Sequence, residues 1–169
     1  PGSYFGNPPA EVLKVAIPRL KGCVDELRKA KNPVNLRPET MGKSAMLGSM
    51  EDTLEMSKAI KGVLPCIDFA HLHARPGDGT INTVLEAYQK ALGKDALKHL
   101  HIHLSGIEYG PKGEKNHLAL GESDLKLNYL FEVLKDFGCA GRILGESPIM
   151  ETDSLNMKKA WMKISGEKE

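Results

Sequence analysis

Residues 63–71 read Val-Leu-Pro-Cys-Ile-Asp-Phe-Ala-His, an apolar run that ends at Asp68 and is followed three residues later by His71. The apolar run predicts a short buried strand over 63–68. Two polar side chains then lie where this strand passes into a loop. For an isolated Asp-x-x-His the ordinary explanation is a buried aspartate that caps the loop backbone. The segment therefore indicates a functional site only if other strand ends carry similar polar residues.

Three further segments place an acid or a histidine at the end of an expected strand. Glu39 follows the run 34–37, His103 lies near the end of the run 97–104, and Glu146 follows the run 141–144. Helical periodicity after Pro8-Pro9 and between the runs gives the order of one helix followed by four strand–helix units. This order predicts an α/β fold with a parallel sheet and right-handed crossovers.

The expected helices are delimited by capping residues. We predict N-caps at Ser49, Thr80, Ser123 and Ser154. The segment 105–122 between the third strand and its helix is rich in Gly and Lys and is predicted to be a long loop. Four strands are too few to close a (β/α)₈ barrel of about 250 residues. The chain is therefore expected to be either an open sheet or roughly half of a barrel.

The four strand ends are expected to form one site. In a barrel the ends of parallel strands meet at a common mouth, which would bring together Glu39, Asp68, His103 and Glu146. Each has an ordinary alternative: Glu39 as an acceptor for the Gly42 backbone, His103 as a core histidine, Glu146 as an acid before a proline turn. Converging buried carboxylates repel one another unless a cation is present, so the joint pattern predicts a divalent metal site.

Several other polar residues lie close to this mouth in sequence. His117 is expected either to fold back over it or to face solvent. Arg75, Lys112 and Lys115 are loop cations suited to contact phosphate. His73 is interpreted as a supporting group or as a residue without a role in the site.

Composition limits the remaining classes of function. The 169 residues carry a net charge of +1, so binding to nucleic acid requires local clusters of Lys and Arg. The three cysteines form no Cys-x-x-Cys pair, the first residues show no charged stretch followed by an apolar one, and no apolar run approaches about 20 residues. We therefore expect a cytoplasmic protein without a membrane partner. Nucleotide-cofactor loops and Gly-x-Ser-x-Gly nucleophile motifs are absent from the sequence.

The segments LRPETMGK, CIDFAHLHARPGD, HIHLSG, KNHLALGES and ILGESP resemble the endonuclease IV family of apurinic/apyrimidinic endonucleases. That family belongs to the xylose-isomerase-like TIM barrels. The likeness spans almost the whole chain, is closest to archaeal members, and covers the C-terminal half or more of the family's domain. It implies that residues 1–169 form a single partial TIM-barrel domain, with about four βα units after a leading helix.

The resemblance also implies a metal content, since the family binds three zinc ions. Glu39 matches a bridging glutamate, and three residues match the other ligands of the same zinc, for which Mn²⁺ is an alternative: Asp68, His103 and Glu146. His71 and His117 match two ligands of another zinc, whose third ligand position holds Lys115, with Glu114 one position earlier. Both histidines of the remaining zinc would precede Pro1-Gly2-Ser3, so we expect a fragment or a cleaved protein.

By this resemblance the full-length protein would hydrolyse the phosphodiester 5′ to abasic sites in DNA repair. Glu39 and Glu146 would be catalytic, next to the attacking hydroxide, and the chain alone would be weak or inactive. One alternative is a sugar isomerase or epimerase of the same superfamily. Another is an inactive metal-binding fragment that associates with itself or with the missing N-terminal half through strand edges near Val34 and Ile143.

Overall fold

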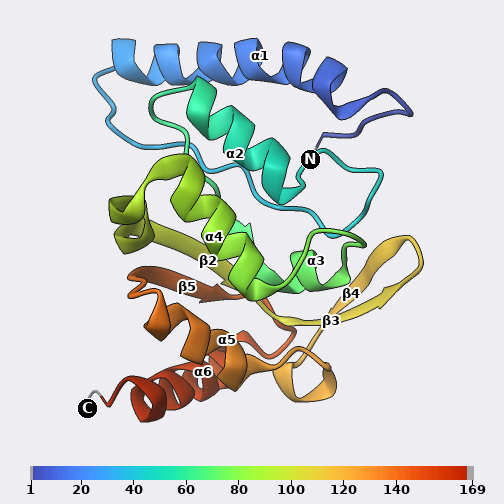
Figure 1. Cartoon of the computed structure of the whole chain (residues 1–169), viewed down its shortest axis with the longest axis vertical. Coiled ribbons are helices and arrows are strands. Elements are labelled where there is room, and N and C mark those ends of the chain that lie inside the picture. Colours follow the sequence, from blue (N-terminus) through green and yellow to red (C-terminus); the bar gives the residue numbers. More distant parts are fainter. Residues whose placement is uncertain (1, 167–169) are drawn as a thin grey trace.

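Three parallel strands form the central sheet in the computed structural model of the chain, which describes residues 2–166 (Figure 1). The strands lie in the order β1 (Ile67–Asp68), β2 (Leu100–Leu104), β5 (Gly141–Gly145). Isolated parallel bridges from Leu36 to Val63 and from Glu39 to Cys66 extend the arrangement to the segment 36–39. The four predicted strand segments therefore neighbour one another in chain order, although the first is too irregular to form a regular strand.

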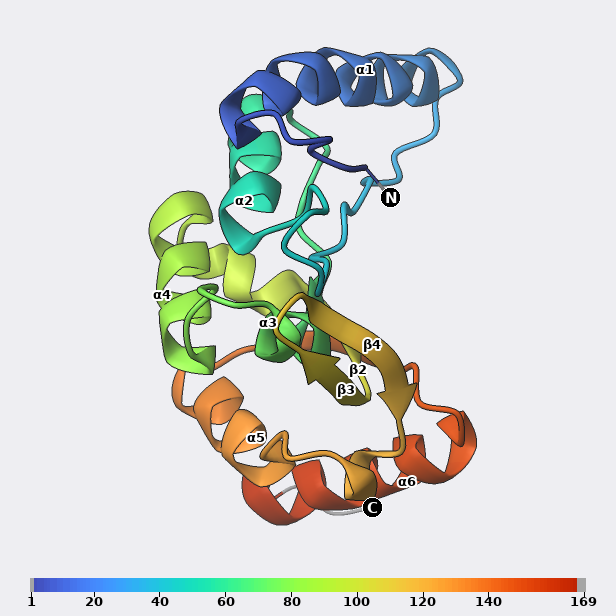
Figure 2. The ribbon, with the colours of Figure 1, turned by 90° about the vertical axis from the view of Figure 1, so that its right-hand side faces the viewer.

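Helices alternate with these strands, as predicted, and pack around them (Figure 2). The α1 helix lies across one end of the molecule above α2, whereas α5 and α6 lie together at the other end. The α-helices are α1 (Pro9–Lys29), α2 (Met50–Ala59), α3 (Phe69–Ala74), α4 (Ile81–Leu92), α5 (Leu127–Asp136) and α6 (Met150–Ser165). Short 3₁₀ helices are η1 (Lys94–His99) and η2 (Leu120–Glu122).

Two apolar clusters hold these layers together. The larger one fills the space between the sheet and α4, α5 and α6, and includes the fully buried Ile67, Leu104 and Leu130. The smaller one, around Val24 and Ile60, joins α1 to α2. Removal of this apolar surface from water is the main favourable term for the fold. The polar residues at the strand ends lie outside both clusters, at the rim of the sheet.

The segment predicted to be a long loop contains a β-hairpin instead. Strands β3 (Gly106–Gly110) and β4 (Gly113–Leu118) pair in antiparallel fashion. Gly113 has φ +99°, and a Cβ there would collide with the backbone of Gly42, so this turn requires glycine. The third predicted strand also begins later than expected, at Leu100, because the residues before it form η1.

Two of the four predicted N-caps are confirmed. Ser49 forms a capping box with Asp52 at the start of α2, and Thr80 accepts a hydrogen bond from the backbone of Thr83 at the start of α4. The other two predictions are wrong. Ser123 lies ahead of α5 and accepts from the backbone N–H of Ile107 in β3, and Ser154 lies inside α6.

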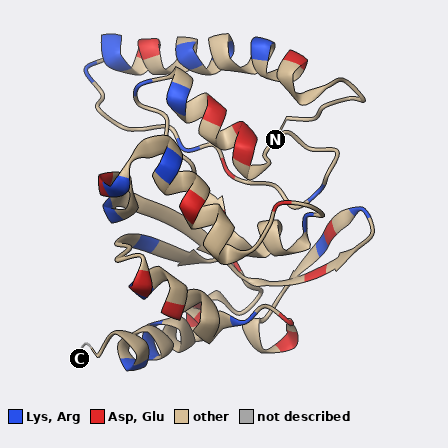
Figure 3. Cartoon of the chain, in the orientation of Figure 1, with Lys and Arg blue, Asp and Glu red and all other residues tan. Residues whose placement is uncertain are grey.

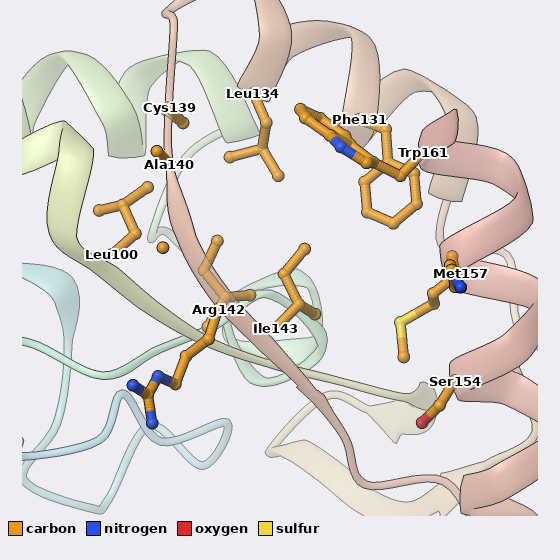
Figure 4. A pocket seen from close by; sticks show the side chains of 13 residues that line it. Leu100, Phe131, Leu134, Cys139, Ala140, Arg142, Ile143, Ser154, Met157 and Trp161 are labelled. Atoms are coloured by element: carbon orange, nitrogen blue, oxygen red, sulfur yellow. The ribbon is translucent and has the colours of Figure 1, made fainter. Parts of the chain in front are cut away.

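An apolar pocket of about 440 Å³ lies between β5 and the α5–α6 pair (Figure 4). The rings of Phe131 and Trp161 line it in an edge-to-face contact with their centroids 5.8 Å apart, and Met157 lies beside them. None of the polar residues at the strand ends lines this pocket. It is a gap in the packing between sheet and helices, separate from the candidate site.

Charge is mixed over the surface of the molecule. Figure 3 shows Lys/Arg and Asp/Glu interspersed along α1, α2 and the β3–β4 hairpin, which agrees with the small net charge. No helix within residues 2–166 has both the length and the apolar character needed to cross a membrane.

The capping analysis yields a stability prediction. Ser49→Ala should lower the free energy of unfolding by about 1 kcal/mol, because the N–H of Asp52 loses its acceptor. Ser154→Ala, at an exposed position within α6, should leave stability unchanged or slightly raised, since alanine favours helix interiors. Urea unfolding followed by circular dichroism measures both; an equal loss for the two variants would contradict the assignment of Ser49 as the cap.

Candidate metal centre

Four side chains from successive strand ends converge at the rim of the sheet. A ligand atom of each of these residues lies within 4.8 Å of the others: Glu39, Asp68, His103 and Glu146. His103 Nδ1 lies 2.9 Å from Glu39 Oε1 and 3.0 Å from Glu146 Oε1. The parallel register that sets Asp68 beside His103 creates this arrangement. We call these four residues the acidic cage.

Asp68 is the most constrained member of the cage. Its side chain is fully buried, and Oδ1 accepts a hydrogen bond of 2.8 Å from the backbone N–H of His71, which caps α3. Its other oxygen, Oδ2, has no hydrogen-bond partner within residues 2–166. Burial, and after it the charge of Glu39, raises the pKa of Asp68. A cation placed against Oδ2 would remove both costs.

A pair of histidines adjoins the cage. His71 Nδ1 lies 2.8 Å from the carbonyl of Thr40, and His117 Nδ1 lies 3.0 Å from the carbonyl of Glu146. A carbonyl only accepts, so both Nδ1 atoms donate, and each Nε2 of the neutral rings carries a lone pair. These two Nε2 atoms are 3.1 Å apart. They repel each other unless a proton or a cation lies between them.

Glu114 completes this second group. Its Oε2 lies 3.2 Å from His71 Nε2 and accepts a hydrogen bond of 3.0 Å from the backbone N–H of Gly42. The position matched by the family motif belongs to Lys115, whose ammonium pairs with Glu108 at 3.0 Å. Burial alone would lower the pKa of His71, but Asp68, the Thr40 carbonyl and Glu114 outweigh it and raise that pKa.

These two groups fit divalent cations by the chemistry of their ligand atoms. Carboxylate oxygens and imidazole nitrogens together suit zinc and manganese. Asp68 lies within ligand distance of both groups, since it also clusters with His71 and His117. The arrangement therefore offers two adjacent cation positions that share one buried carboxylate.

Other predicted residues lie outside these groups. Arg75 corrects an expectation: it is buried, donates to the carbonyls of Met41 and Lys43, and pairs with Asp78 at 3.3 Å, so its guanidinium is not available to phosphate. His73 pairs with Asp124 at 2.8 Å, away from the cage.

The two predicted lysines lie on the β3–β4 hairpin. Lys112 occupies its turn, and Lys115 lies on β4 with more than half of its side chain exposed. Both are accessible to a ligand that approaches the hairpin.

Sequence reasoning missed Thr40 entirely. This residue is fully buried; its carbonyl orients His71, and its hydroxyl accepts from the backbone N–H of Asp68 at 2.9 Å. A threonine next to a glutamate carries no signal for such a role. The expected contact of Glu39 with Gly42 is also not formed, because Glu114 takes that N–H.

A parallel α/β sheet whose strand ends carry converging acidic and imidazole ligands defines a barrel-type protein with a candidate metal centre at its mouth. Residues 1–164 match the family described as Xylose isomerase-like TIM barrel, and the chain therefore belongs to this family. The predicted fold class is thereby confirmed.

Comparison with known proteins gives two informative relatives in sequence and one protein of similar fold. The chain is 37% identical, over 97% of its length, to an uncharacterised protein of Methanocaldococcus jannaschii, and 27% identical, over 94% of its length, to a probable endonuclease 4 of Oceanobacillus iheyensis. It spans 62% and 54% of these two proteins. In structure it resembles the 3-keto-D-glucoside 4-epimerase of E. coli, with a TM-score of 0.61 over 96% of this chain and 56% of that one. At 17% identity this last likeness concerns the fold alone.

The acidic cage leads to a prediction about metal affinity. Asp68→Asn should weaken zinc binding by at least about tenfold, because it removes the buried charge nearest both groups. His73→Ala, outside the cage, should leave binding unchanged. Isothermal titration calorimetry with zinc measures both, and equal losses would contradict the ligand assignment.

The second group leads to a separate prediction. Glu114→Gln should lower the affinity for a second zinc ion by about tenfold, since the amide still accepts from Gly42 but carries no charge. Glu108→Gln, on the same hairpin but exposed, is the matched control. A two-step titration that is identical in the parent and in Glu114→Gln would exclude Glu114 as a ligand.

Proposed function

We propose that the whole protein containing this chain is a divalent-metal-dependent phosphodiesterase that cleaves DNA 5′ to abasic sites. The observation that carries the proposal is the pair of adjacent ligand groups that share Asp68. Two neighbouring cations are the arrangement suited to in-line displacement at phosphorus, where both the attacking and the leaving oxygen need stabilisation.

The acidic cage would hold one ion through its four side chains. The second ion would lie between His71, His117 and Glu114. His71 Nε2 is 3.1 Å from His117 Nε2 and 3.2 Å from Glu114 Oε2. When bound, such ions activate water and neutralise charge on a phosphoryl group. Glu39 and Glu146 remain only partly buried at the mouth, so their carboxylates can also orient water or accept a proton there.

The protein surface near the mouth supports a polyanionic substrate only locally. The β3–β4 hairpin, which carries His117 and Glu114, also presents Lys112 and Lys115. Cations on the element that supplies metal ligands would place a phosphate backbone beside the site. The buried Arg75 instead stabilises the loop 41–46 by donating hydrogen bonds to its carbonyls.

The relative named a probable endonuclease 4 supports the same assignment. The competing activity is sugar isomerisation or epimerisation, which the fold also accommodates and which the E. coli epimerase represents. Epimerisation at a carbohydrate needs a base and polarisation of one oxygen, and it leaves the second ligand group without an evident use.

Incision of DNA tests the proposal. Zinc-loaded whole protein should cleave a duplex with one abasic site on its 5′ side and leave the intact duplex uncut, and chelation should abolish cleavage. Asp68→Asn should reduce the rate by at least about tenfold, whereas His73→Ala should retain it.

The same preparation should be offered keto-glucosides and simple aldoses. Turnover of a sugar with no incision of abasic DNA would replace the phosphodiesterase with the epimerase or isomerase. Absence of both activities in a metal-loaded whole protein would also count against the proposal.

A further inference from the structure

A second layer of potential ligands lies directly beneath the acidic cage. The parallel register pairs Ile67 with Ile102 and Asp68 with His103, so Cys66, just before β1, lies beside His101 of β2. Side chains two positions apart on a strand share a face. Cys66 and His101 therefore lie on the face that carries Asp68 and His103, one layer further from the mouth.

The side chains in this layer approach one another closely. One ligand atom from each of Cys66, His101 and His103 lies within 4.8 Å of the other two. The imidazole rings of His101 and His103 have centroids 5.3 Å apart and are tilted by 58°. Cys66 is a free, buried thiol, and both histidines are half-buried.

Packing within the two apolar clusters of the described residues does not account for Cys66 and His101. Cys66 belongs to neither apolar cluster of the described chain, although its side chain is only 2% exposed. Within residues 2–166 the His101 ring lies against the ring of His103, and no hydrogen bond of a His101 ring nitrogen is found there. Cys139 provides the contrast, because this half-buried thiol packs against the larger apolar cluster and lines the apolar pocket beside Leu134.

We propose that Cys66, His101 and His103 form a further metal site, selective for a thiophilic d¹⁰ cation such as zinc, cadmium or cuprous copper. One sulfur and two imidazoles are the soft ligand set that these ions prefer, in contrast to the oxygen-rich cage above. Three protein ligands leave a fourth position open. Binding releases the thiol proton of Cys66 to solvent and forms a bond between the sulfur and the cation.

His103 belongs to both layers. Its Nδ1 is within 3.0 Å of Glu39 and Glu146, and the same residue closes the Cys66–His101 group. An ion in the lower site therefore either shares this imidazole or withdraws it from the cage. Occupancy of the two sites should be coupled through His103.

Cadmium alone is a suitable probe, because only a thiolate ligand gives the near-ultraviolet charge-transfer band of a cadmium–sulfur bond. The parent for the test is Cys23→Ser/Cys139→Ser, in which Cys66 is the remaining thiol. In this parent the band should appear and saturate at about one ion per chain, as one converging ligand set predicts. It should vanish in the parent that also carries Cys66→Ser.

Two histidine variants complete the test. His101→Asn should weaken cadmium binding, read from the same band, by at least about tenfold. His99→Asn, at an exposed position of η1 two residues away, should leave it unchanged. Thermal unfolding checks that each variant is folded; if Cys66→Ser is not, the two histidine variants decide.

Three outcomes would overturn the proposal. They are a parent with no band, a band that survives Cys66→Ser, and equal affinities in His101→Asn and His99→Asn. None of these readouts depends on nuclease activity, so the metal site and the proposed function fail independently.

Discussion

Repulsion between the ligand atoms that the strand ends bring together is the constraint on which the candidate site depends. At the rim of the sheet three carboxylates surround one imidazole, and one oxygen of the fully buried Asp68 has no hydrogen-bond partner within residues 2–166. Next to them lie the Nε2 atoms of His71 and His117, 3.1 Å apart, and each of these atoms carries a lone pair when its ring is neutral. Arrangements of this kind are costly in a low dielectric unless positive charge is present. Bound cations would turn the same contacts from a cost into a source of stability.

The surrounding backbone holds these atoms in place through groups that are not ligands. Oδ1 of Asp68 accepts a hydrogen bond from the backbone N–H of His71 and so caps α3, and this cap sets the position of His71. Thr40 then orients the ring of His71 through its carbonyl. Buried Arg75 donates hydrogen bonds to backbone carbonyls of the loop that follows Thr40. Such outer contacts determine which nitrogen faces the metal position, which matters as much as the identity of the ligand.

The β3–β4 hairpin shows how much of the site depends on contacts between distant parts of the chain. It folds back so that Gly113 lies against Gly42, and this close approach lets Glu114 reach the same backbone. Its Pro-Lys turn lacks the Asn-Gly or Asp-Gly signal that marks a tight hairpin in sequence. The sequence therefore predicts a loop for this segment, and only the structure shows the hairpin. The cap predicted at Ser123 is wrong for a similar reason, because its hydroxyl accepts from the distant backbone N–H of Ile107, whereas Ser154 is not a cap because α6 already begins at Met150.

By itself the sequence determined the alternation of strands and helices, the caps at Ser49 and Thr80, and the set of residues at the strand ends. These features depend on periodicity and on hydrogen bonds that span three or four residues, and such information is local. Only the tertiary structure decided that Glu114 rather than Lys115 faces the histidines, that Arg75 is buried, and that Cys66 lies beside two imidazoles. Those outcomes depend on distances between residues that are tens of positions apart, and the packing of the sheet and hairpin sets these distances.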